Sequence, residues 1–243
     1  MRASMKTSLL GSAVVLLACG FASYADDTAN TLTEKEKGDG WKLLFDGKTT
    51  QGWKAYRGTE VGDNWHVEDG VLVLKPGSGK RGGDIVTTDD YDNFELTFDW
   101  KISPGGNSGV MYRVSEDEDA PWFTGIEYQI LDNAKHPDGR KPKTSAASAY
   151  DLYAPAKDVT KPVGEWNQSK IIANGNHVEH WLNGEKVVEF DLGSDDWNEH
   201  YQKSKFKEMK RFAKESKGKI DLQDHGNEVA YRNIKLRPLK AKD

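Results

Sequence analysis

Three strand-like stretches of the chain carry polar side chains at alternating positions, which a strand would place on one face. In GIEYQILDN, Glu127 and Gln129 alternate with apolar residues, so a carboxylate and an amide are expected side by side on a sheet. Such a pair suits the recognition of sugar hydroxyls, and the carboxylate could also act as a general base. Asp132 and His136 follow in the loop after this strand. Together they predict a polar site at this strand.

The other two stretches supply further polar groups. In SGVMYRV, Met111 and Arg113 are expected to share a face, and Asn107 lies in the preceding glycine-rich turn. In LQDHG, Gln223 and His225 are expected to share a face, and the residue between them points away. An exposed sheet face explains any one of these patterns, but three in one chain favour a binding or catalytic site.

Several familiar chemistries have no motif in this sequence. There is no GxGxxG, Walker, HExxH or GxSxG pattern. His177 and His180 would fall on opposite faces of a strand, which is poor for chelating a metal. Glu189 and Asp191 have the first spacing of the ExDxxE pattern of retaining glucanases, but Ser194 stands where the third acid belongs. The two-carboxylate glycosidase mechanism therefore has no anchor.

The elements that must position these residues are mostly strands. Asp69-Gly70 and Asn183-Gly184 each separate two strand-like segments, and both pairs tolerate the positive φ of a tight hairpin turn. Short strands at near-regular spacing with glycine-rich turns predict an all-β sandwich or jelly roll. Spaced aromatic residues within 195–215 predict a short helical excursion. No linker or repeat interrupts the chain, so we expect one domain over 41–239.

The N-terminal segment is typical of a secretory signal. A basic start is followed by an apolar run of about 13 residues, shorter than the roughly 20 that a spanning helix needs. We expect a signal peptide over 1–25, or a lipoprotein signal over 1–18 that leaves Cys19 lipidated. A flexible tether is expected over 26–40. The protein is thus expected to be exported to the periplasm or the cell exterior, with membrane attachment only through a lipid on Cys19.

Composition narrows the classes of function further. The net charge of −5 gives no electrostatic reason to bind nucleic acid. The single Cys excludes a disulfide framework and a cysteine-cluster metal site. Many Trp and Tyr residues together with 24 Gly are common in carbohydrate-handling sheets. Trp122 lies in a loop-like segment and is a candidate for the rim of a sugar site.

At these motifs the chain resembles a bacterial family, the 3-keto-disaccharide hydrolase domain family. The segments that carry the resemblance cover nearly all of residues 40–239 and include GWKLLFDGKTTQGW, WHVEDGVLVL, GIEYQILDN, NHVEHWLNGEKVVEF and LQDHGNEVAYRNIKLRPL. The resemblance implies a concanavalin A-like, glucanase-type jelly roll with a sugar-binding face. It also implies cleavage of 3-keto glycosides that a partner sugar 3-dehydrogenase produces.

A 3-keto substrate would give the candidate residues distinct roles. The C3 ketone acidifies the C2 proton, so one base could remove it and the C1 aglycone could leave, with water adding later; direct hydrolysis is the other route. Glu127 is then the expected base or acid, His225 its proton partner and Arg113 the stabiliser of the enolate oxygen. The remaining candidates would bind substrate hydroxyls: Asn107, Gln129, Asp132, His136, Gln223 and Trp122.

Other interpretations stay open on the sequence alone. A divalent metal could take the enolate role, with ligands from Glu127, Asp132, His136 or His225; no cofactor is otherwise indicated. A non-catalytic lectin-like module could use the same face to bind glycans. An envelope structural domain anchored through Cys19 would need no site at all.

Overall fold

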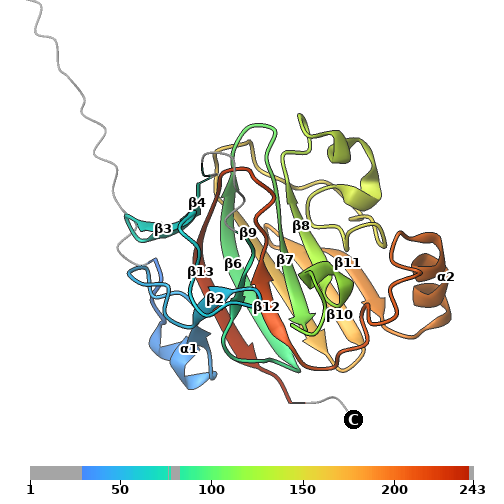
Figure 1. Ribbon diagram of the computed structural model, residues 1–243, viewed down its shortest axis with the longest axis horizontal. Coiled ribbons are helices and arrows are strands. Elements are labelled where there is room, and N and C mark those ends of the chain that lie inside the picture. The colour runs from blue at the N-terminus through green and yellow to red at the C-terminus, as the bar shows by residue number, and fades with distance from the viewer. Residues whose placement is uncertain (1–28, 76, 78–82, 241–243) are drawn as a thin grey trace, which may run out of the picture.

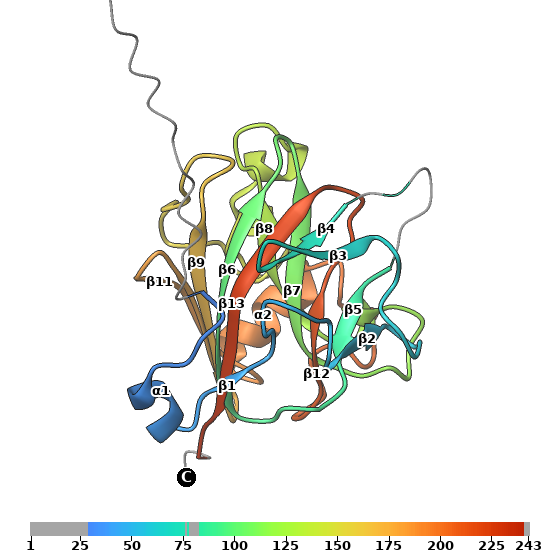
Figure 2. The ribbon, with the colours of Figure 1, turned by 90° about the vertical axis from the view of Figure 1, so that its left-hand side faces the viewer.

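The computed structural model describes residues 29–75, 77 and 83–240. The predicted signal, its alternative cleavage sites and Cys19 lie outside the described residues. Within them, two antiparallel sheets pack face to face (Figures 1 and 2). No helix in these ranges is long and apolar enough to cross a membrane. The predicted all-β sandwich is therefore confirmed.

The larger sheet has eight strands in the order β11-β10-β9-β6-β13-β4-β3, with β1 also paired to β13. Its strands are β1 (Lys42–Leu43), β3 (Trp65–Glu68), β4 (Val71–Leu74), β6 (Phe94–Ile102), β9 (Asn167–Asn174), β10 (His177–Leu182), β11 (Glu185–Asp191) and β13 (Val229–Pro238). Both predicted hairpins are present here. The β3–β4 turn holds Asp69 at φ 48° and Gly70 at φ 78°, and the β10–β11 turn holds Asn183 at φ 50° and Gly184 at φ 85°.

The smaller sheet has five strands in the order β2-β5-β12-β7-β8. They are β2 (Trp53–Ala55), β5 (Ile85–Thr87), β12 (Lys219–Leu222), β7 (Asn107–Val114) and β8 (Ile126–Leu131). Ile126, Tyr128 and Ile130 of β8 face the larger sheet in the shared core. The Tyr128 hydroxyl reaches across to Ser169 of β9 at 2.7 Å. The alternate residues of β8 therefore face away from the core.

Helices are few and short. They are α1 (Glu34–Gly38), α2 (Asp195–Lys203) and the 3₁₀ turns η1 (Pro121–Phe123), η2 (Pro137–Arg140) and η3 (Pro142–Thr144). The predicted excursion contains α2, which Ser194 caps by accepting a hydrogen bond from the Trp197 amide at 3.1 Å. The helix ends at Lys203, and the rest of the excursion is turns in which Phe206 and Phe212 stack at 3.9 Å.

The segment 26–40 was expected to be a flexible tether, and the structure corrects this for its described part. Asn30 is buried, and its amide group donates to the Gly70 carbonyl at 2.7 Å. Helix α1 begins with a capping box between Thr33 and Glu36. Glu36 also pairs with Lys235 of β13 at 2.8 Å. Local capping and these two long-range contacts hold this segment on the larger sheet.

Candidate active site

The face of the smaller sheet that points away from the core carries a grid of polar side chains, which we call the site face. One row across the strands is Asp221 (β12), Met111 (β7) and Glu127 (β8). The next row contains Gly109 (β7) and Gln129 (β8), which are in register. Gln223 joins this row, because its backbone N–H donates to the Gly109 carbonyl at 2.9 Å. Residues of all three predicted stretches therefore lie on this one face, in keeping with the alternation of side chains along a strand.

Gly109 leaves the space that the Glu127 carboxylate occupies. A Cβ on residue 109 would lie 2.5 Å from Glu127 Oε1 and 2.9 Å from its Cγ, closer than atoms can approach. Because residue 109 has no side chain, Glu127 leans across β7 toward the second row. This glycine is required for space rather than for an unusual backbone angle.

Burial and neighbouring charges shift the pKa of Glu127. Its side chain is 6% exposed. Burial raises the pKa of Glu127 to about 7, the ammonium of Lys205 lowers it, and Asp84 and Asp138 raise it. No hydrogen bond from a described residue contributes to this shift of the pKa. A carboxyl group with this pKa can exchange a proton near neutral pH.

Sequence reasoning missed two acids beside Glu127. Asp221 is fully buried, and both its carboxylate oxygens lack a hydrogen-bond donor among the described residues. Burial, and then repulsion from Asp84 and Glu127, raises the pKa of Asp221 well above its usual value. Asp84 precedes β5 and accepts from the Asp224 amide at 2.8 Å. A signal was present, since Asp221 stands between two apolar residues and shares the alternation phase of Gln223.

Other predicted residues do lie on or beside this face. Asn107 and Gln223 are buried, and the side-chain oxygen of each lacks a donor within the described ranges. Gln129 is buried and its amide group contacts the Thr144 carbonyl at 3.4 Å. Beyond the end of β12, the exposed His225 ring lies 6.3 Å from that of His136. His136 accepts from the Asp138 amide at 3.2 Å, so its other ring nitrogen is the one available to a ligand.

The expectation that Arg113 shares the face of Met111 is wrong. Arg113 has φ 54°, and the pairing between β12 and β7 shifts register between Lys219 and Asp221. This bulge breaks the alternation and re-aims the side chain. The guanidinium instead donates to the carbonyls of Asp92 at 3.0 Å and Gly175 at 2.8 Å. Asp92 lies just before β6, and Gly175 lies in the turn between β9 and β10 of the larger sheet.

Replacing Arg113 with alanine is therefore expected to act on stability. The buried guanidinium holds two turns, and its loss leaves two carbonyls without their charged donor. We expect the free energy of unfolding to fall by about 2 to 4 kcal/mol in urea titrations. The control, Arg57→Ala, removes an exposed pair with Asp119 and should change stability by less than about 1 kcal/mol. Equal losses of stability in the two variants would contradict this role of Arg113 in holding the two turns.

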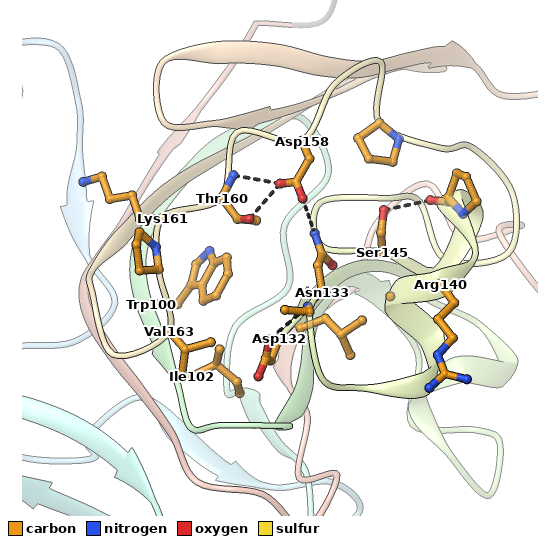
Figure 3. Close-up of a pocket in the computed structure, with 16 residues that line it drawn as sticks. Trp100, Ile102, Asp132, Asn133, Arg140, Ser145, Asp158, Thr160, Lys161 and Val163 are labelled. Atoms are coloured by element: carbon orange, nitrogen blue, oxygen red, sulfur yellow. Dashed lines mark hydrogen bonds between the residues drawn. The ribbon is translucent and has the colours of Figure 1, made fainter.

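Asp132 also has a different task from the one expected. Its carboxylate accepts from the backbone amides of Gly105 at 2.7 Å, Ala134 at 3.0 Å and Lys135 at 3.2 Å. These bonds close the loop after β8 and use three of the carboxylate's about four acceptor sites. Asp132 lines a cavity of about 610 Å³ with Trp100 and Asn133 (Figure 3). Asn133 in turn donates to Asp158, another residue of this wall, at 3.0 Å.

Trp122 lies at the edge of the site face. Its side chain is 38% exposed. It lines a cavity of about 310 Å³ together with Tyr56, Asp84 and Asp224. Asp224, expected to point away from Gln223, accepts from the Gly83 amide at 3.1 Å and so fixes the chain beside Asp84.

The two histidines of the β10–β11 hairpin lie apart from this site, on opposite faces of β10 as predicted. His180 is buried in the core, where its Nε2 contacts the Tyr112 hydroxyl at 3.0 Å; burial lowers the pKa of His180 to about 4. His177 lies on the outer face of the larger sheet, with ligand atoms within 4.8 Å of those of Glu179 and Glu189. Lys186 pairs with both acids, 2.6 Å from Glu189 and 3.4 Å from Glu179.

Known proteins resemble this chain in both sequence and fold. A 3-keto-disaccharide hydrolase of Bacteroides thetaiotaomicron is 36% identical over 229 residues, covering 83% of this chain and 79% of that protein. A crystal structure of a proposed glycosyl hydrolase of Parabacteroides distasonis ATCC 8503 superposes with a TM-score of 0.80 at 39% identity, covering 87% of this chain and 100% of that one.

A more distant structure gives evidence for the fold alone. A Bacillus subtilis protein with a galectin-like fold has a TM-score of 0.50 at 14% identity, over 88% of this chain and 96% of that one. The lectin-type sandwich is thus confirmed. The family model described as the 3-keto-α-glucoside-1,2-lyase-like domain matches residues 40–237. The chain therefore belongs to the 3-keto-α-glucoside-1,2-lyase-like domain family and is a carbohydrate-active enzyme of that group.

Proposed function

We propose that this enzyme cleaves the glycosidic bond of 3-keto disaccharides by removing the C2 proton, expelling the C1 aglycone and then adding water. The name of the Bacteroides relative supports the substrate class, and the lyase-like family description supports elimination. The observation that carries the proposal is Glu127, a carboxylate whose burial raises its pKa to about 7, on a sheet face rich in buried polar side chains.

The reaction needs one base rather than two opposed glycosidase carboxylates. The ketone at C3 lets the electrons of the C2–H bond move into an enolate. Glu127 takes the proton, the enolate collapses, and the C1–O bond breaks with its electrons going to the aglycone oxygen. The product is an unsaturated 3-keto sugar, and addition of water across its double bond completes a net hydrolysis. A base with a pKa near the working pH is the most effective for the first step.

The surrounding groups support binding of a sugar. Asn107 and Gln223 present buried side-chain oxygens that have no donor among the residues the structure describes, and a substrate hydroxyl would satisfy each of them. His225 and His136 lie near each other at one end of the face. We assign to His225 the delivery of a proton to the leaving aglycone oxygen. Trp122 would offer an apolar ring at the rim.

The experiment that tests this function is incubation with 3-ketotrehalose in D₂O, followed by NMR. Elimination and hydration should release glucose and place deuterium at C2 of the keto sugar. Direct hydrolysis would release the same sugars with the C2 proton retained, which would overturn the mechanism but keep the substrate. Binding without product would instead identify a lectin-like module. A sample without enzyme corrects for spontaneous exchange next to the ketone.

The location and the pathway belong to the same proposal. The signal-like sequence over 1–25 supports export, and LLAC ending at Cys19 supports a lipid anchor as the alternative. A 3-keto sugar must come from oxidation of the C3 hydroxyl, so an oxidoreductase acting on the disaccharide is the partner upstream. Labelling with a radioactive fatty acid in wild type and Cys19→Ser separates the two N-termini, because only a lipoprotein loses its label in the variant.

A further inference from the structure

Tyr150 lies beside Glu127 at the edge of the site face. Its backbone N–H donates to the Glu127 carbonyl at 3.1 Å, and the preceding residue, Ala149, pairs with Tyr128 of β8. Tyr128 and Ala149 both belong to the core, so alternation turns Tyr150 toward the face that carries Glu127. Burial, and then the charges of Asp138 and Glu127, raise the pKa of the Tyr150 hydroxyl.

The ammonium of Lys205 lies over this tyrosine. It is 4.1 Å from the centroid of the Tyr150 ring and 4.9 Å from that of the Phe206 ring. Rings attract a cation placed in this way. The backbone here is fixed, because the Lys205 N–H donates to the Asp151 carboxylate at 2.7 Å and the two flanking residues, Ser204 and Phe206, are buried. The Lys205 side chain itself is exposed, so its ammonium is open to a ligand.

Lys205 and Glu127 influence each other through space. Burial raises the pKa of Glu127 and the charge of the Lys205 ammonium lowers it, with no contribution from a hydrogen bond between the two groups. A sugar on the site face can therefore meet the carboxylate and the ammonium together. Arg113, expected to stabilise the enolate oxygen, is instead held by the carbonyls of Asp92 and Gly175.

We propose that Lys205 is a second catalytic residue, whose ammonium stabilises the enolate oxygen at C3 while Glu127 holds the C2 proton. This role rests on the proposed function. As Glu127 takes the proton, the C2–H electron pair forms the C2=C3 bond and negative charge moves to the C3 oxygen. The ammonium keeps its own protons and attracts this charge. When the enolate collapses, the C3 carbonyl returns, a C1=C2 bond forms, and the C1–O electron pair leaves with the aglycone.

The exposure of Lys205 in the free enzyme determines when the ammonium acts. Water around a cation weakens its attraction for charge, and a bound sugar that displaces this water strengthens it. The C3 oxygen becomes negative only after the C2 proton has left. The attraction is therefore greater in the transition state than in the bound substrate, and its loss should lower kcat more than it changes KM.

The kinetic test compares full-length wild type, Lys205→Met, Lys205→Arg and Lys207→Met with 3-ketotrehalose. We expect Lys205→Met to lower kcat by about tenfold, less than the about 10²- to 10³-fold of a buried, preorganised oxyanion donor. Lys205→Arg keeps the charge and should recover most of the rate. Lys207 is the matched control, because it is an exposed lysine two residues further on, and Lys207→Met should keep full activity.

The pH profile distinguishes a catalytic charge from a structural effect. In Lys205→Met no ammonium lowers the pKa of Glu127, so the acidic limb of kcat/KM should move to higher pH than in wild type. A variant that is only partly folded would lose activity at every pH and leave the position of this limb unchanged.

A binding measurement separates this proposal from the proposed function. Glucose 3-sulfate carries a negative charge next to the oxygen that becomes charged in the enolate. In calorimetric titrations of wild type we expect it to bind about tenfold more tightly than glucose, as an ion pair on a bound, partly desolvated ligand allows. Lys205→Met should lose this preference, and Lys207→Met should keep it.

The outcomes differ for the two proposals. Turnover by wild type with full kcat in Lys205→Met, or equal losses in Lys205→Met and Lys207→Met, would overturn the role of Lys205 and keep the proposed function. A preference for the sulfate that depends on Lys205, without turnover of any 3-keto disaccharide by wild type, would keep Lys205 as the cation at the C3 oxygen and overturn the proposed function. Absence of both turnover and preference would overturn both.

Discussion

Replacing Glu127 with glutamine is expected to lower kcat/KM on a 3-keto disaccharide by about 10²- to 10⁴-fold. Glutamine keeps the shape of the side chain over Gly109 but cannot accept the C2 proton. Binding of the unreacted sugar should change little, so the loss should fall on kcat. Steady-state kinetics with the matched control Glu68→Gln checks this, because Glu68 is a half-exposed partner of Lys75 on the β3–β4 hairpin. Full turnover by Glu127→Gln would remove Glu127 from the mechanism.

The pH dependence of the wild-type enzyme tests the direction of the proton transfer. As a base, Glu127 must be ionised in the free enzyme, and burial raises the pKa of Glu127 to about 7. The value of kcat/KM should therefore fall about tenfold per pH unit below pH 7. If Glu127 were the acid of the reaction, the loss would instead appear above pH 7. A profile that stays flat down to about pH 5 would contradict both roles.

The same pKa shift provides a check that Glu127→Gln is folded. The pKa of the carboxyl rises from 4.5 in a free chain to about 7 in the folded enzyme. Between these values the folded state binds the extra proton, so wild-type stability decreases as the pH rises from about 4.5 to about 7. The whole shift corresponds to about 3 kcal/mol. Glutamine has no such dependence, so the variant should gain stability relative to wild type across this window and keep the gain above it.

How far the sequence predicted the molecule depends on the range of the interactions involved. Asn183-Gly184 and Asp69-Gly70 encode their hairpins locally, through the positive φ that both turns require. Alternation correctly placed Glu127 and Gln129 on one face because β8 is regular along its length. These parts of the fold and the site could be predicted since each depends on neighbours in the chain.

The failures come from contacts between distant residues. The bulge that turns Arg113 away depends on the register between β7 and β12, about a hundred positions apart, which no local pattern reveals. Asp84 reaches the site only because β5 pairs with β12. The segment around Asn30 looked like a linker because its partners, Gly70 and Asn233, lie 40 and 203 residues away. Propensity describes a segment, whereas burial depends on what the completed fold places against it.

Replacing Gly109 with alanine is expected to have the second large effect on activity. Gly109 lies on β7, and its role depends on Glu127 of the neighbouring strand β8. The new Cβ would lie 2.5 Å from Glu127 Oε1, so the carboxylate must move off the second row of the site face. A displacement of about 1 Å at a reacting group can cost about 10²-fold in rate, and we expect a loss of kcat of that size. The fold should survive, because crowding of this kind costs about 1 to 3 kcal/mol.

The control and a double variant decide whether Gly109→Ala acts through Glu127. Gly38→Ala introduces the same methyl group where no atom lies within 4 Å, and should leave kcat unchanged. If the glycine matters only as space for the carboxylate, adding Gly109→Ala to Glu127→Gln should cost much less than its effect in wild type, because the base is already gone. Losses that multiply would mean that residue 109 contacts the sugar itself. The site face would then use its hollow at Gly109 for the substrate rather than to position the base.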